Sequence, residues 1–185
     1  MPPITPEESI LIQALALAES YVKLGELEVG NDPLISDNID RVFGPTGKQL
    51  TQLGHSIFKG QGTLVSVFYM FLVLPHEWAN KGVGDFGNLD FSESKAEAFA
   101  REKAMVEKDY EDKNYGALKH FRNALSHGRI YGREDGTLVI EDKNNRNECF
   151  RAVYSYKVLG ELAQHLSEAI TTHLNKAMSQ RPPKA

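Results

Sequence analysis

The most informative segment of the chain is Lys119-His120-Phe121-Arg122-Asn123-Ala124-Leu125-Ser126-His127-Gly128-Arg129. On a repeat of 3.6 residues, one face is apolar and comprises Tyr110, Ala117, Leu118, Phe121, Ala124 and Leu125. The opposite face is polar and comprises Lys119, Arg122, Asn123, Ser126 and His127. Gly128 follows directly, and glycine most easily takes the left-handed conformation at which helices end. The pattern predicts an amphipathic helix from about Glu111 to His127 with an arginine and a histidine on its polar face.

The composition is that of an ordinary globular protein. The chain has 185 residues, enough for one domain with a full hydrophobic core. Its formal net charge of −4 argues against a general nucleic-acid coat protein but leaves room for a local basic site. The single cysteine, Cys149, excludes an intramolecular disulfide and has no metal-binding spacing. Thr63–Leu74, the most apolar run, is shorter than the ~20 residues that span a bilayer, and no signal-like segment is present, so we expect a cytoplasmic protein with no membrane partner.

Helical patterns dominate the first half of the chain. Thr5-Pro6-Glu7-Glu8 has the features of a capping box and predicts a helix that ends at Leu24, before Gly25. Thr63–Trp78 predicts the most hydrophobic helix, at the centre of the bundle, kinked or ended by Pro75. The other helices expected here are short ones over Ser36–Phe43 and Lys48–Lys59 and a longer one from Ser92 to the region of Asp109.

The charge pattern reverses just before the motif. Asp85–Lys113 carries nine acidic and five basic residues, whereas Lys119–Arg133 carries four basic and none that is acidic. Carboxylates at helical spacing, Glu93 with Glu97 and Glu107 with Glu111, could hold a divalent cation, although a solvated face is the commoner meaning of such a run. The basic stretch favours phosphate binding.

After the motif helix the pattern changes to that of strands. Arg129–Gly132 and Thr137–Ile140 flank a turn that contains Asp-Gly, which predicts a β-hairpin, and Cys149–Tyr154 predicts a third strand. Ser155 then caps a final helix with the apolar stripe Leu159, Leu162, Leu166, Ile170 and Leu174. We expect residues 1–178 to form a single domain and residues 179–185 to be a disordered tail.

The segment Arg122-Asn123-Ala124-Leu125-Ser126-His127 resembles the signature of the HEPN superfamily, in which an arginine and a small polar residue precede a histidine near the end of a helix. The order of motif helix, glycine, hairpin and closing helix is also similar, over about Tyr110 to Ala177. The resemblance implies a mainly α fold, a bundle of four to six helices with a small β-hairpin or three-stranded insert between the motif helix and the C-terminal helix. It further implies a metal-independent endoribonuclease, often a toxin or an antiviral defence component, which usually works as a homodimer with one composite cleft.

The residue types of the motif suit RNA cleavage by attack of a 2′-hydroxyl on the adjacent phosphorus. Histidine exchanges protons near neutral pH, so His127 can act as acid or base, and Arg122 offers a fork of donors to phosphate oxygens. Asn123 lies four residues before His127, where its amide can orient the imidazole or bind substrate. A second copy of the chain would supply the second histidine, so that neither a metal nor a cofactor is needed.

Three neighbours of this catalytic set, Lys119, Ser126 and Arg129, are the expected RNA contacts. His120 is expected at the surface, and His76 at a helix end rather than in a metal site. If the protein is a toxin, an antitoxin or inhibitor protein is an expected partner. In some family toxins a tyrosine two residues after the histidine is modified, but Arg129 occupies that position here and the nearest tyrosine is Tyr131.

Two other functions remain open. One is a non-catalytic dimerisation or scaffold module, a role that the hydrophobic helix beginning at Thr63 would suit. The complete Arg-Asn…His set favours the enzyme, because a scaffold has no need of all three side chains. A metal-dependent nuclease is a more distant alternative. Cleavage that persists in EDTA would favour the metal-independent endoribonuclease over it.

Overall fold

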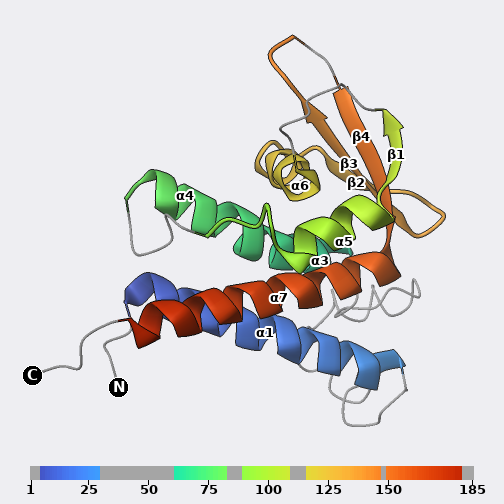
Figure 1. Cartoon of the computed structure of the whole chain (residues 1–185). Helices are drawn as coiled ribbons and strands as arrows, with labels where there is room; N and C mark the ends of the chain where they lie inside the picture. The colour runs from blue at the N-terminus through green and yellow to red at the C-terminus, as the bar shows by residue number, and fades with distance from the viewer. Residues whose placement is uncertain (1–4, 30–60, 83–88, 109–115, 147–148, 181–185) are drawn as a thin grey trace, which may run out of the picture.

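The computed structural model describes residues 5–29, 61–82, 89–108, 116–146 and 149–180. The helices expected at 36–43 and 48–59 and residues 181–185 of the expected tail lie outside these ranges, as does the expected start of the motif helix at 111–115. Within the described part, long helices form a bundle, and an antiparallel sheet stands at one end of it with the motif helix, α6, against its face (Figure 1).

The first helix, α1, spans Pro6–Val29 and begins with the predicted capping box. The backbone N–H of Thr5 donates to Glu8 Oε2 at 2.9 Å, and the N–H of Glu8 donates to Thr5 Oγ1 at 3.3 Å. The prediction that Gly25 ends this helix is wrong, because the helix continues through it. A glycine inside a helix costs only about 1 kcal/mol, which the rest of a long helix can offset.

The central helical rod is built from α3 (Gln61–Phe68), a π-helical turn η1 (Tyr69–Val73) and α4 (Leu74–Asn80), which follow one another directly (Figure 1). Pro75 lacks the N–H that would bond to the carbonyl four residues earlier. The backbone widens just before it, so that the N–H of Leu74 donates to the carbonyl of Tyr69, five residues back. Phe68 and Phe71 are fully buried, which confirms the central position of the rod.

The next helix, α5, is shorter than predicted. It spans Lys95–Lys103, after which the chain extends at Ala104 into strand β1, Met105–Lys108. The prediction of one helix to the region of Asp109 is therefore wrong. β1 pairs antiparallel with the later strand β4, and this long-range pairing overrides the local helical pattern.

The sheet contains the predicted hairpin and third strand. Strands β2 (Ile130–Gly132), β3 (Thr137–Lys143) and β4 (Cys149–Ser155) join β1 in the antiparallel order β1-β4-β3-β2. β3 runs three residues further than predicted. Because side chains on a strand alternate, Asp142 falls on the same side as the buried core residues Leu138 and Ile140.

The motif helix α6 spans Ala117–Ser126, so the prediction that it runs from about Glu111 is wrong: Gly116, directly before it, is extended. The predicted apolar face is buried from Ala117 to Leu125, and its further member, Tyr110, lies outside the described residues. The helix ends as expected at Gly128, which has a φ of 64°. The N–H of Gly128 donates to the carbonyl of Leu125 at 3.2 Å and the N–H of Arg129 to that of Ala124 at 2.8 Å, which is the Schellman arrangement.

The last helix, α7, spans Tyr156–Ser179 and begins where Ser155 Oγ accepts a hydrogen bond from the N–H of Val158 at 3.3 Å. All five residues of its predicted apolar stripe are buried. The predicted fold class, a mainly helical bundle with a small sheet before the C-terminal helix, is thus confirmed, with one further strand than expected. None of the helices among the described residues combines the length and apolar character needed to cross a bilayer.

Candidate active site

The N-terminus of the motif helix is held by a buried carboxylate from α5. Glu97, whose side chain is only 4% exposed, accepts hydrogen bonds from the N–H groups of Ala117 at 2.7 Å and Leu118 at 2.9 Å. Gly116 gives this carboxylate its room, because a Cβ there would lie 2.8 Å from Glu97 Oε1. Glu97, expected on a solvated face, therefore caps α6, with Arg101 as its ion-pair partner.

A second buried carboxylate holds the side of the same helix. Asp142 on β3, with a side chain 5% exposed, contacts His120 Nδ1 at 2.9 Å and accepts a hydrogen bond from Asn123 Nδ2 at 3.1 Å, both on its Oδ2 atom. The ring of His120 stacks on Phe150, with centroids 3.8 Å apart and planes 6° from parallel. The prediction that His120 lies at the surface is wrong, since it is buried between the helix and the sheet.

These contacts also set the charge of Asp142. Burial by itself would raise the pKa of this carboxyl, but the hydrogen bonds from His120 and Asn123 and the charge of His120 outweigh burial, and the net pKa is lowered. Asp142 is therefore ionised at neutral pH and remains a strong acceptor.

The amide of Asn123 connects this buried carboxylate to the arginine of the motif. Its nitrogen donates to Asp142, so its oxygen is left to accept from Arg122 Nη2 at 3.4 Å. Asp142, Asn123 and Arg122 thus form a chain that restricts the guanidinium. The expected contact between Asn123 and His127 is not among the hydrogen bonds of the described residues.

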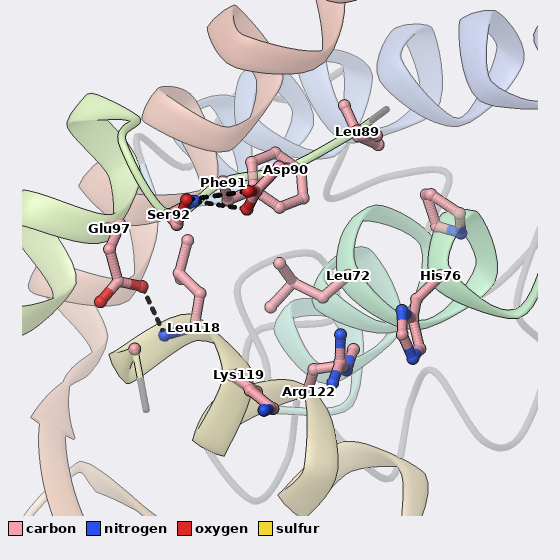
Figure 2. Close-up of a pocket in the computed structure, with 12 residues that line it drawn as sticks. Leu72, His76, Leu89, Asp90, Phe91, Ser92, Glu97, Leu118, Lys119 and Arg122 are labelled. Carbon is pink, nitrogen blue, oxygen red and sulfur yellow. Dashed lines mark hydrogen bonds between the residues drawn. The ribbon is translucent and has the colours of Figure 1, made fainter. Parts of the chain in front are cut away.

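Arg122 lines a pocket of about 280 Å³ between α4, α6 and the segment Leu89–Ser92. Figure 2 shows Arg122 and Lys119 along one side, from α6, with His76 of α4 next to Arg122 and Asp90 across the opening. The apolar part of the lining is Leu72, Pro75, Leu89, Phe91 and Leu118. The pocket therefore combines two cations on one side with a lining that is partly apolar and partly polar, and its polar part includes Asp90, Ser92 and Glu97.

His76 is one of the residues of this pocket that the sequence did not assign to the site. Burial lowers the pKa of His76 and the charge of Arg122 lowers it further; Glu77 opposes them with a smaller effect, and Lys119 adds the smallest lowering. The ring is therefore neutral at pH 7, and its Nε2 lies 3.1 Å from Asn80 Nδ2. Because the amide nitrogen can only donate, Nε2 accepts and the ring proton lies on Nδ1. The one signal in the sequence is a histidine directly after Pro75 in an otherwise apolar helix.

His127 lies apart from this pocket. It is the C-terminal capping residue of α6, exposed, with its backbone N–H bonded to the carbonyl of Asn123 at 3.1 Å. Ser126 is likewise exposed, and its hydroxyl donates to the carbonyl of Arg122 at 3.0 Å. The structure thus brings Arg122 and Asn123 together, with Lys119 nearby. His127 and Ser126 instead lie exposed to solvent at the C-terminal end of the helix.

The predicted basic stretch is divided by the fold. Arg133 pairs with Glu107 of β1 at 2.7 Å, and the half-buried Arg129 is not part of the pocket lining. Of the four cations from Lys119 to Arg133, only Lys119 and Arg122 line the pocket. Glu97 and Glu107 serve α6 and Arg133 respectively, and within the described ranges no three His, Cys, Asp or Glu side chains gather as a metal site would require.

Fold and motif define a class of protein: a helical bundle with an inserted antiparallel sheet, in which one helix carries Arg-Asn…His. A family model described as HEPN pEK499 p136 matches residues 28–177, which is most of the chain. The chain therefore belongs to the HEPN superfamily, whose members are commonly ribonucleases. The match begins well before Tyr110, so it includes helices that the resemblance of the motif did not reach. No curated protein and no solved structure gives a significant match.

Proposed function

We propose that this protein is a metal-independent endoribonuclease that cleaves RNA by attack of a 2′-hydroxyl on the adjacent phosphorus. The observation that carries the proposal is the fixed guanidinium of Arg122, which Asn123 and Asp142 hold beside Lys119 at the rim of a pocket in a HEPN domain. A cation held in place before the reaction stabilises the charge that develops on the phosphorane without reorganisation.

Each motif residue has a distinct part in this reaction. His127 exchanges protons: the 2′-hydroxyl loses a proton to a base, and the departing 5′-oxygen gains one from an acid, leaving a 2′,3′-cyclic phosphate and a 5′-hydroxyl. Arg122 binds the phosphate oxygens, and Asn123 holds Arg122. Lys119, Ser126 and Arg129 contact the RNA backbone around them.

One chain offers one exposed imidazole at the end of α6, whereas the reaction needs an acid and a base. We therefore propose a homodimer in which the motif helices of two copies face one cleft and each supplies His127. An activity of this kind in a small protein suits a toxin or a defence component, controlled by an antitoxin or another inhibitor protein.

The proposal is tested by incubating the pure protein with end-labelled RNA in EDTA. Wild-type protein should give fragments that end in a 2′,3′-cyclic phosphate. Arg122→Ala and His127→Ala should each reduce the rate at least ~100-fold while the unfolding transition is retained. Lys176→Ala, which removes an exposed cation on α7, is the matched control and should cleave normally.

Three outcomes would contradict the proposal. Intact RNA with the wild-type protein would favour a non-catalytic module. Cleavage that persists in both motif variants would remove Arg122 and His127 from the mechanism. Cleavage that EDTA abolishes would indicate a metal-dependent nuclease.

A further inference from the structure

The pocket beside Arg122 is large enough for a single nucleotide base. Its volume is about 280 Å³, slightly below the roughly 300–1,000 Å³ of sites that take drug-sized ligands. A base with part of its ribose fits such a space, whereas a stretch of several nucleotides does not.

The walls suit a flat ring that carries an anionic group at one end. Apolar side chains enter the pocket from three segments: Phe91 from the segment before α5, Leu72 from η1 and Leu118 from α6 (Figure 2). An aromatic face and aliphatic walls are what unstacked RNA bases contact in proteins. Arg122 and Lys119 stand together on one side, where they can hold the phosphate attached to such a base.

Asp90 adds a fixed hydrogen-bond acceptor across the pocket from Arg122 (Figure 2). Its Oδ1 accepts from the N–H of Ser92 at 2.9 Å and its Oδ2 from the Ser92 hydroxyl at 2.9 Å. These two hydrogen bonds lower the pKa of Asp90, so the carboxylate is ionised. Each of its oxygens can still accept a further hydrogen bond.

We infer that this pocket binds the base of the nucleotide whose phosphate contacts Arg122, and that Asp90 makes guanine the preferred base. Guanine is the common base with two adjacent N–H donors on its Watson–Crick edge, which match the two oxygens of one carboxylate. Uracil presents a single N–H between two carbonyl oxygens, which the carboxylate repels. The inference rests on the proposed function, because it names the specificity of the same site.

The first test measures binding and does not depend on cleavage. Guanosine 3′-monophosphate and uridine 3′-monophosphate are titrated separately into the full chain in a calorimeter. Wild-type protein should bind the guanosine nucleotide at least ~10-fold more tightly.

Asp90→Asn should remove most of this difference, since an amide presents only one acceptor. Glu93→Gln alters an exposed carboxylate three residues away, outside the pocket, and should keep it. Equal affinities in the wild type, or a preference that survives in Asp90→Asn, would overturn the inference.

The second test maps the sites cut in a mixed-sequence RNA. Wild-type cleavage should concentrate next to guanosine, and Asp90→Asn should redistribute it over all bases. If cleavage needs Arg122 and His127 but Asp90→Asn leaves the pattern unchanged, the guanine pocket is wrong and the nuclease stands. If cleavage is indifferent to Arg122 and His127, the nuclease is wrong, and the nucleotide titrations alone decide for or against the pocket.

Discussion

Two buried carboxylates hold the motif helix, and they hold different parts of it. Glu97 on α5 accepts hydrogen bonds from backbone N–H groups at the start of α6. Asp142 on β3 contacts side chains, His120 and Asn123, along the flank of the same helix. One carboxylate therefore fixes where the helix begins, and the other fixes how its side chains are oriented.

Within this one helix, Glu97 contributes mainly to stability and Asp142 mainly to function. Backbone N–H groups are present whatever the sequence of α6, so a carboxylate that binds them stabilises the helix without regard to the motif. The contact with Asn123 exists only because that residue follows Arg122, and it restricts the guanidinium directly. Removing Glu97 should thus affect mainly folding, whereas removing the charge of Asp142 should affect the rate per folded molecule.

The largest loss of stability is expected for Glu97→Ala. It leaves the N–H groups of Ala117 and Leu118 without their acceptor, and each unsatisfied buried donor costs about 1–3 kcal/mol. Urea unfolding should show the free energy of unfolding lowered by ~2–4 kcal/mol, whereas Glu93→Ala, at an exposed position, should change it by less than ~0.5 kcal/mol. Equal small changes in both variants would mean that Glu97 does not cap α6.

A smaller loss of stability with a clear loss of activity is expected for Asp142→Asn. The amide keeps the shape but cannot serve both His120 and Asn123 as well as a carboxylate does, which should cost about 1–2 kcal/mol of stability. RNA cleavage per folded molecule should fall ~10-fold, mainly through a lower kcat, because Arg122, which stabilises the phosphorane, loses its support.

Two companion variants decide how Asp142 acts. Glu134→Gln, at an exposed carboxylate in the turn between β2 and β3, should leave both stability and cleavage unchanged. In an Arg122→Lys background, Asp142→Asn should add little further loss of cleavage, because the two changes act on one group. Full additivity there would show that Asp142 does not act through Arg122.

The smallest expected effect is a dependence on pH. The hydrogen bonds to Asp142 outweigh its burial and hold its pKa below the usual value in the folded protein, so the folded state favours the ionised form. The stability that this carboxyl contributes is present above its unfolded pKa of about 3.9 and is lost as the pH falls through the lower, folded pKa. The difference in unfolding free energy between wild type and Asp142→Asn should therefore be full at pH 7 and shrink below about pH 4. A difference that grows in acid would reverse the sign of the pKa shift.

Local patterns predicted the elements that depend on neighbours in sequence. The Thr5–Glu8 capping box, the glycine after α6 and the Asp-Gly hairpin have partners within a few residues, the apolar stripe of α7 shows in the local periodicity, and all four are confirmed. The two exceptions have different causes: α1 continues through Gly25 because one glycine costs a long helix little, and β1 forms because its pairing with β4 outweighs a weak local preference.

The candidate site could be predicted only in part. The sequence by itself determined that Arg122, Asn123 and His127 lie on one helix that stops at Gly128, because helical periodicity and glycine stereochemistry are local properties. Only the tertiary structure decided that Asp142, 19 residues after Asn123, holds its amide, that His120 is buried, and that His76 stands beside Arg122. Those contacts join α6 to β3 and α4, and no spacing along the chain encodes which distant side chains meet once the bundle and the sheet have packed.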